Sequence, residues 1–286
     1  MSLLTLENTA LVADSTCDPP PGYFDRDGMA IVPLRVHFGD ETYRDLVDLS
    51  PEAFFEKLRT SPVHPTTSQP TAADFEACYG SLRKSYEHVF SFHLSRLMSG
   101  TYEAAAGVAE GMTNVHVYDT RFVSTAITLI VDRVRGRLEE GIAGDDLEAY
   151  IARLLVGTRL IFQVATLEYL RRGGRIGRAS AMVGDVLGIR PILHCTEGEL
   201  EAYAKVRGQR RAIETMAGYL EKHASPDDAV SVALFHIEAP DALPALEERL
   251  LALRPQARIV LPGATVGAIV GTHAGPGVFA FTMVVE

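Results

Sequence analysis

Short apolar runs alternate with amphipathic segments through the first half of the chain. Four segments have the apolar, β-branched character of buried strands: residues 10–13, 29–38, 88–94 and 115–118. Five segments have the periodicity of helices: residues 51–59, 72–86, 101–111, 121–138 and 144–155. Strands that alternate with helices predict a mostly parallel sheet with helices on both faces.

Local signals fix the starts of two of these helices. Ser50-Pro51-Glu52 combines a capping serine, a proline at the first helical position and an acidic first turn. Thr71 and Asp74 have the spacing of a capping box, with Asp in place of Glu. Pro33 interrupts the strand predicted over residues 29–38, which favours an edge position or a strand start.

The pattern changes in the second half. Strands are predicted at residues 160–165, 230–237, 266–272 and 278–285, with a hairpin over 191–207 that turns at Glu197-Gly198. Helices are predicted at residues 167–172, 208–223 and 240–252. We therefore expect an α/β protein of two α/β domains, residues 1–160 and 161–286, with a mixed sheet in the second.

Composition and charge narrow the class of protein. The 286 residues are 47% hydrophobic and carry a net charge of −10, which argues against a nucleic-acid binder. The three cysteines are widely spaced, and the nine histidines do not cluster, so neither a disulfide framework nor a metal site is expected. The chain shows no secretory signal and no apolar run of membrane-spanning length, and we expect a cytoplasmic protein.

The segment Pro65-Thr66-Thr67-Ser68-Gln69-Pro70 places hydroxyl and amide groups between two prolines. Prolines at both ends discourage helix and sheet, so we expect a stiff, extended loop that presents uncharged donors to a ligand. A plain polar loop is the alternative.

Three further polar clusters fall where ligands bind in α/β sheets, beyond the carboxyl ends of strands. They are Asp14-Ser15-Thr16, the segment 94–101 that holds Ser95, Ser99 and Thr101, and His273-Ala274-Gly275-Pro276-Gly277 after a predicted strand. Ser99 and Thr101 at a helix start favour an anion, although simple helix capping explains them equally well. Asp14 has the same capping alternative, and His273 that of a structural histidine.

The only dense basic run is Arg171-Arg172-Gly173-Gly174-Arg175-Ile176-Gly177-Arg178. On an acidic background it favours a surface for an acidic partner, or a glycine hinge between solvated arginines, over a nucleic-acid patch. The apolar run that follows it, residues 179–189, favours core packing or the wall of an apolar pocket. The chain contains no GxSxG, HExxH, GxxxxGK[ST] or GxGxxG motif, so no catalytic residue is expected.

Taken in order, these motifs resemble the DegV family of fatty-acid-binding proteins, which includes the FakB subunits of bacterial fatty acid kinase. The resemblance covers essentially the whole chain. It rests on these pieces: Asp14-Ser15-Thr16, Val32 to Val36, Pro65 to Pro70, Ser99-Gly100-Thr101-Tyr102, Arg172 to Ile176, Gly198 with Lys205-Val206-Arg207, and His273 to Gly277.

The resemblance implies a long-chain fatty acid buried between and within the two domains, and no other cofactor. It implies that Thr67 and Ser99 bind the carboxylate, with Thr66, Ser95 and His273 close by. It further implies a lipid-binding carrier, not itself an enzyme, in phospholipid metabolism. Such a carrier presents the carboxylate to a separate ATP-dependent kinase, and Arg175 and Arg207 match basic positions suspected of contacting that partner.

One position departs from the family, because Arg96 stands where a second serine is common. If Arg96 points inward it can pair with the carboxylate, and if it points outward one hydroxyl of the network is lost. Two other functions compete with the carrier: a small-molecule phosphotransferase with His273 as phospho-acceptor, and a lipid-sensing regulatory module that binds its partner through residues 171–178.

Overall fold

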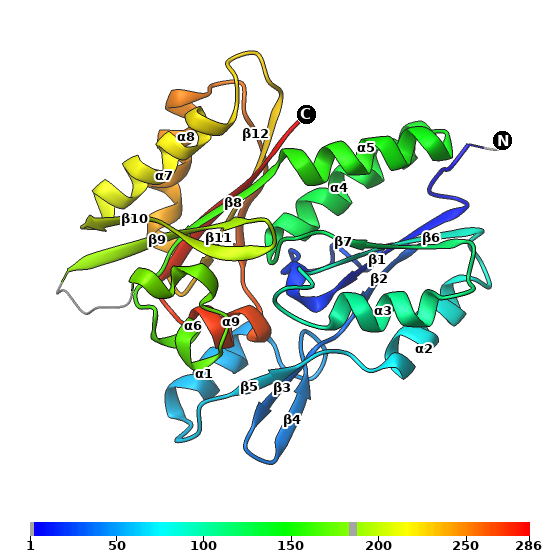
Figure 1. Ribbon diagram of the computed structural model, residues 1–286, viewed down its shortest axis with the longest axis horizontal. Helices are drawn as coiled ribbons and strands as arrows, with labels where there is room; N and C mark the ends of the chain where they lie inside the picture. The colour runs from blue at the N-terminus through cyan, green and yellow to red at the C-terminus, as the bar shows by residue number, and fades with distance from the viewer. Residues whose placement is uncertain (1–2, 183–187) are drawn as a thin grey trace.

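Two large sheets lie side by side in the computed structural model, which describes residues 3–182 and 188–286 (Figure 1). The first sheet has the strand order β2-β1-β6-β7, and every pairing in it is parallel. Its strands are β1 (Thr9–Asp14), β2 (Met29–Val32), β6 (His88–His93) and β7 (Val115–Asp119).

Helices cover both faces of this first sheet, as predicted. Helices α2 (Ala72–Leu82) and α3 (Thr101–Ala109) pack on one face, and α4 (Thr125–Glu140) packs on the other. Thr71 and Asp74 form the predicted capping box at the start of α2. The turn after each strand therefore opens at the same edge of the sheet, which is where the polar clusters of the sequence were expected.

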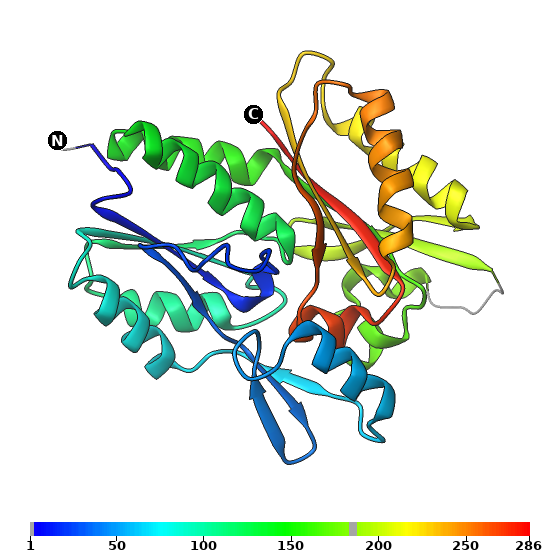
Figure 2. The ribbon, with the colours of Figure 1, turned by 180° about the vertical axis from the view of Figure 1, so that it is seen from behind.

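The second sheet is mixed, with the order β10-β9-β8-β13-β11-β12 and one parallel pair, β11 with β12. Its strands are β8 (Thr158–Gln163), β9 (Ile189–Thr196), β10 (Glu199–Arg207), β11 (Val230–Ile237), β12 (Arg258–Thr265) and β13 (Val278–Val285). Helices α7 (Gln209–His223) and α8 (Leu243–Leu253) cover its outer face (Figure 2). The predicted hairpin turn is confirmed, since Glu197 and Gly198 both have positive φ.

Helix α4 joins the two sheets, because it contacts β1 and β6 of the first and β8, β11 and β13 of the second. Helix α5 (Gly144–Gly157) runs beside α4 and leads directly into β8. One apolar core extends from Phe90 and Phe92 across α4 to Leu193 and Phe235. A domain boundary near residue 160 stays a prediction; the two halves share this core.

A small antiparallel sheet, of order β4-β3-β5, lies below both large sheets (Figure 1). Its strands are β3 (Arg35–Phe38), β4 (Glu41–Arg44) and β5 (Thr66–Ser68), and it is flanked by α1 (Pro51–Thr60) and α9 (Ala268–Ala274). The single strand predicted over residues 29–38 is wrong: it breaks at Pro33, and its halves, β2 and β3, belong to different sheets.

The structure contradicts two further predictions. Residues 66–68 form strand β5 and pair with β3, although we expected prolines on both sides to exclude a sheet. Residues 266–272 were predicted as a strand, but residues 268–274 form α9, so His273 lies in the last turn of a helix. The strand of that region is β12, which was not predicted because Pro262 and Gly263 interrupt its apolar pattern. The remaining short helix of this region is α6 (Glu168–Arg172).

Two helical glycines give a matched test of this packing. A Cβ on Gly157, at the end of α5, would overlap the backbone carbonyl of Val285 in β13, whereas a Cβ on Gly136 in α4 meets open space. Gly157→Ala should lower the free energy of unfolding by about 1–3 kcal/mol, and Gly136→Ala should raise it by up to about 1 kcal/mol. Urea unfolding of both variants measures this, and equal effects would contradict the close α5–β13 contact.

Candidate functional site

A cavity of about 280 Å³ lies between the two large sheets and the small one. Its volume is near the lower limit of about 300 Å³ for small-molecule sites. The walls are mostly apolar and come from both halves of the chain, and include Leu34, Leu94, Leu160, Phe162, Leu170, Leu200, Phe235, Ile237, Ile269 and Val278. Polar side chains also line it, among them Thr67, Gln69, Ser99, Arg175 and His273.

Thr67 and His273 meet in the wall of this cavity. Thr67 lies in the middle of β5, and its Oγ1 is 2.9 Å from Nε2 of His273 on α9. Strand β5 pairs with β3 so that Thr67 stands opposite Val36, a fully buried residue. Thr67 therefore faces inward, and its neighbours Thr66 and Ser68 face the other side of the small sheet.

The imidazole of His273 is neutral at physiological pH. Burial lowers the pKa of His273 to about 4, and the nearby charges of Arg175 and His64 act in the same direction. A glycine is needed beside the ring, because a Cβ on Gly173 would overlap Nδ1. Backbone conformation does not require glycine there, since the φ of Gly173 is −74°.

The tautomer of His273 determines whether the Thr67 hydroxyl donates to the ring or accepts from it. His273 Nδ1 is buried and has no partner among the described residues. Orphaned N–H donors are rarer in proteins than orphaned acceptors, which favours the tautomer with its hydrogen on Nε2. In that tautomer His273 donates to Thr67 Oγ1, and the Thr67 hydroxyl keeps its own hydrogen for a ligand.

Ser99 reaches the same cavity from the first sheet. It precedes α3, whose cap residue is Gly100 and whose first turn receives no side-chain cap. The alternative that Ser99 is a simple helix cap is therefore wrong; its hydroxyl is 2.9 Å from that of Thr101. Free N–H groups at the start of α3 add partial positive charge to this end of the cavity.

Two residues expected near the carboxylate do not line the cavity. Thr66 is exposed and lies on the opposite face of β5 from Thr67. Ser95 is fully buried, and its hydroxyl donates to the carbonyl of Gly198 at 2.6 Å, so it fastens the β9–β10 turn to the segment after β6.

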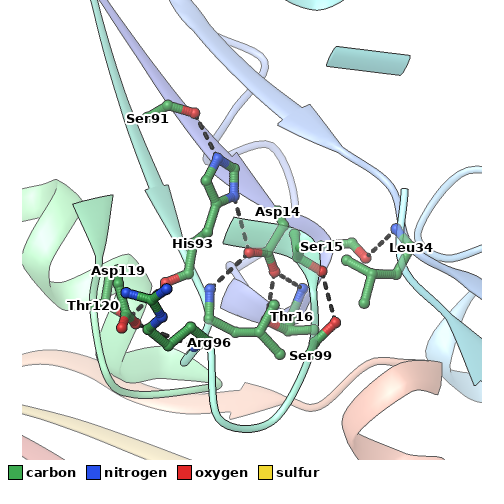
Figure 3. A network of polar contacts seen from close by, with 12 residues as sticks. Asp14, Ser15, Thr16, Leu34, Ser91, His93, Arg96, Ser99, Asp119 and Thr120 are labelled. Carbon is green, nitrogen blue, oxygen red and sulfur yellow. Dashed lines mark hydrogen bonds and ion pairs between the residues drawn. The ribbon is translucent and has the colours of Figure 1, made fainter. Parts of the chain in front are cut away.

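Arg96 points outward. Its guanidinium pairs with Glu103 at 3.0 Å and lies over the ring of Tyr102, and its side chain is about half exposed. Figure 3 shows it beside Asp119, on the side away from the Asp14 carboxylate. Of the two orientations left open by the sequence, the structure has the one in which Arg96 makes no contact with the cavity and one hydroxyl of the family pattern is absent.

The two arginines expected to contact a partner lie apart. Arg175 lines the mouth of the cavity, where it donates to the carbonyls of Met98 and Gly173. Arg207 is exposed at the far end of β10. Gly177 lies so close to the backbone of Leu200, near the start of β10, that a Cβ there would overlap it, and the eight residues from Leu200 to Arg207 extend over about 20 Å. Arg175 thus belongs to the cavity mouth and Arg207 to a separate surface.

Buried Asp14 holds the two segments that carry Thr16 and Ser99 (Figure 3). One carboxylate oxygen accepts from the backbone and hydroxyl of Thr16, and the other from the backbone N–H of Leu94 at 2.8 Å. The capping alternative for Asp14 is thus confirmed. The carboxylate also contacts His93, whose other nitrogen is 2.7 Å from Ser91 Oγ.

Ser91, His93 and Asp14 have the order of a hydrolytic triad. All three are fully buried, none lines the cavity, and Tyr79 donates to the Ser91 hydroxyl. With no space for a substrate at Ser91, the chain of hydrogen bonds serves to fix the ends of β1 and β6.

Two other buried carboxylates hold the start of α9. The backbone N–H of Gly267 donates to Asp18 at 2.7 Å, and that of Ala268 donates to Asp45 at 3.0 Å. Burial raises the pKa of both groups, that of Asp45 to about 7. These contacts position the helix that carries His273.

Several polar residues that line the cavity were not predicted as site residues, among them Thr16, Gln69 and Ser124. Thr16 has the signal of a polar residue after a strand, and Gln69 follows Thr67 at the two-residue period of a strand.

Among residues 3–182 and 188–286, no group of three or more His, Cys, Asp or Glu side chains can hold a metal ion. In the same part of the chain, no helix is long and apolar enough to cross a membrane.

The fold and the site define a two-domain α/β protein with an apolar cavity between its domains and a hydroxyl-rich polar end. Comparison with protein families agrees: the model described as "Uncharacterised protein, DegV family" matches residues 8–286. The chain belongs to the DegV family.

Relatives match over nearly their whole length. Protein DegV of Bacillus subtilis is 31% identical over 94% of this chain and 96% of its own. A DegV domain-containing protein of Streptomyces coelicolor is 34% identical, with the same shares covered.

Solved structures of DegV family proteins also match nearly the whole chain. A DegV family protein from Thermus thermophilus, described by its fatty acid binding, is 34% identical with a TM-score of 0.90, covering 98% of this chain and 100% of that one. DegV of Bacillus subtilis, described as a fatty acid binding protein, is 30% identical with a TM-score of 0.86, covering 98% and 99%.

The lowered pKa of His273 predicts a pH dependence of stability. Between pH 6.5 and about 4 the unfolded chain binds a proton at His273 that the folded protein does not bind. Stability therefore falls with decreasing pH across this window, by up to about 3 kcal/mol from this group alone.

Urea unfolding of the wild type and of His273→Gln, both free of lipid, isolates this contribution. Asp45 and the other titrating groups contribute to both proteins and cancel in the difference. The wild type should lose more stability than the variant on acidification, and parallel curves would show that His273 is not buried as a neutral ring.

Proposed function

We propose that this protein binds a long-chain fatty acid in the cavity between its sheets and presents the carboxylate to an ATP-dependent kinase. The observation that carries the proposal is the Thr67–His273 pair at the polar end of a mostly apolar cavity. Relatives at 30–34% identity that are described as fatty acid binding support it. In this role the protein is a carrier and not an enzyme.

The tail supplies most of the affinity. Burial of a methylene is worth about 0.8 kcal/mol, so about fifteen methylenes give on the order of 12 kcal/mol before the costs of association. Leucine, isoleucine, valine and phenylalanine side chains line the cavity away from β5, which suits a saturated or unsaturated hydrocarbon. Both large sheets enclose the tail with apolar side chains, so no charged group is needed to hold it.

The polar end supplies orientation. The Thr67 hydroxyl, polarised by neutral His273, and the Ser99 hydroxyl donate to the carboxylate, each bond worth about 1.5–3 kcal/mol. Arg175 at the mouth adds an attractive charge. Thr66 and Ser95 serve this site indirectly, through the small sheet and the β9–β10 turn. The carboxylate then lies beneath the opening, where a second protein can reach it.

The competing function, phosphoryl transfer through His273, has no specific support in this geometry. Nε2 of His273 is engaged with Thr67, and Nδ1 faces the backbone of Gly173. A phospho-acceptor needs one nitrogen free to attack a phosphoryl group.

Native mass spectrometry of the purified protein tests the ligand. We expect a co-purifying mass that matches a long-chain fatty acid, and about ten- to hundredfold weaker rebinding of that acid after Thr67→Val. A wild-type protein that neither co-purifies with nor rebinds a fatty acid would overturn the proposal.

The carrier role predicts that Arg207 contacts the kinase and takes no part in fatty acid binding. Arg207→Glu should leave fatty acid affinity within about twofold, and lower acyl phosphate formation with the kinase by about tenfold. Lys84→Glu, which reverses an exposed charge on the first domain, is the control and should change neither. Equal kinase activity of Arg207→Glu and the wild type would remove Arg207 from the partner surface.

A further inference from the structure

The side chain of Gln69 lies on the cavity face of the small sheet. Gln69 follows β5 two residues after Thr67, so the two share a face, whereas Ser68 turns away and contacts His37 at 2.9 Å. Gln69 lines the same cavity as Thr67 and Ser99. Gln69 is exposed, and no hydrogen bond from its carboxamide to another described residue ties that group down.

Gly100 provides the space for this carboxamide. A Cβ on Gly100 would overlap Gln69 Oε1 and come within 3.3 Å of Nε2. The backbone of Gly100, with φ −77° and ψ 14°, is open to any residue. Glycine is therefore required here by the approach of Gln69 and not by the conformation of the chain. The contact holds the carboxamide beside Ser99 and the start of α3.

We propose that Gln69 is a further head-group contact that selects a free carboxylate. Its N–H group donates to the carboxylate oxygen that faces the mouth, while Thr67 and Ser99 hold the other oxygen. The inference rests on the proposed function, because it assigns a residue to the same head-group site. An esterified head group offers only a neutral carbonyl oxygen, which accepts a weaker hydrogen bond than an ionised carboxylate does, so Gln69 favours the free acid over its esters.

Gln69→Glu is the sharpest test, because it keeps the size of the side chain and replaces its donors with a negative charge. At pH 8 the variant should bind a long-chain fatty acid at least tenfold more weakly than the wild type, and its methyl ester no more than about threefold more weakly. Gln209→Glu, an exposed glutamine on α7, adds the same charge away from the cavity and should bind both ligands as the wild type does.

Gly100→Ala moves the carboxamide without altering residue 69. We expect about three- to tenfold weaker binding of the acid and little change for the methyl ester. This variant keeps the inference open to test if Gln69→Glu fails to fold.

The outcomes separate the inference from the function on which it depends. Acid binding by Gln69→Glu within twofold of the wild type, or an equal loss for acid and ester, would overturn the role of Gln69. If Thr67→Val still weakens acid binding in that case, the proposed function stands. A wild type that binds no fatty acid would refute both.

Discussion

The hydrogen bond between Thr67 and His273 joins two short elements, and local sequence alone does not stabilise either of them. The residues are 206 positions apart, one in a three-residue strand and one in the last turn of a seven-residue helix. Neither element is stable by itself. The small sheet, α1, and the apolar walls of both large sheets have to be in place before this pair can form the polar end of the cavity.

Buried carboxylates maintain that arrangement at a cost. Asp18 and Asp45 accept from the first N–H groups of α9, and Asp14 joins the segments that follow β1 and β6. Burial disfavours the charged forms of Asp18 and Asp45, and the hydrogen bonds that these two groups accept offset part of this cost. Asp14 in the turn after the first strand thus serves to position the site, while Thr16, Thr67, Gln69, Ser99 and His273 are among the polar residues that line the cavity.

The sequence predicted the layers of the fold well, because periodicity and local caps report local structure. The capping box at Thr71, the hairpin turn at Gly198 and the strands on either side of it are local features, and the structure confirms them. Helix α9 was missed because its caps come from residues 249 and 223 positions earlier in the chain, so its β-branched run resembled a strand. Long-range contacts also explain two other errors. Strand β5 pairs with β3, which precedes α1 in the sequence, and Ser95 donates to Gly198, 103 positions later, instead of lining the cavity.

The most direct test of the account is the ionisation of the bound head group, followed by NMR of a fatty acid isotope-labelled at its carboxyl carbon. Donors at Thr67 and Ser99 and the charge of Arg175 favour the ionised form, so the bound carboxyl group should titrate at lower pH than the same acid in water. Thr67→Val should raise that midpoint. A bound carboxyl group that titrates as in water, in both the wild type and the variant, would contradict the account.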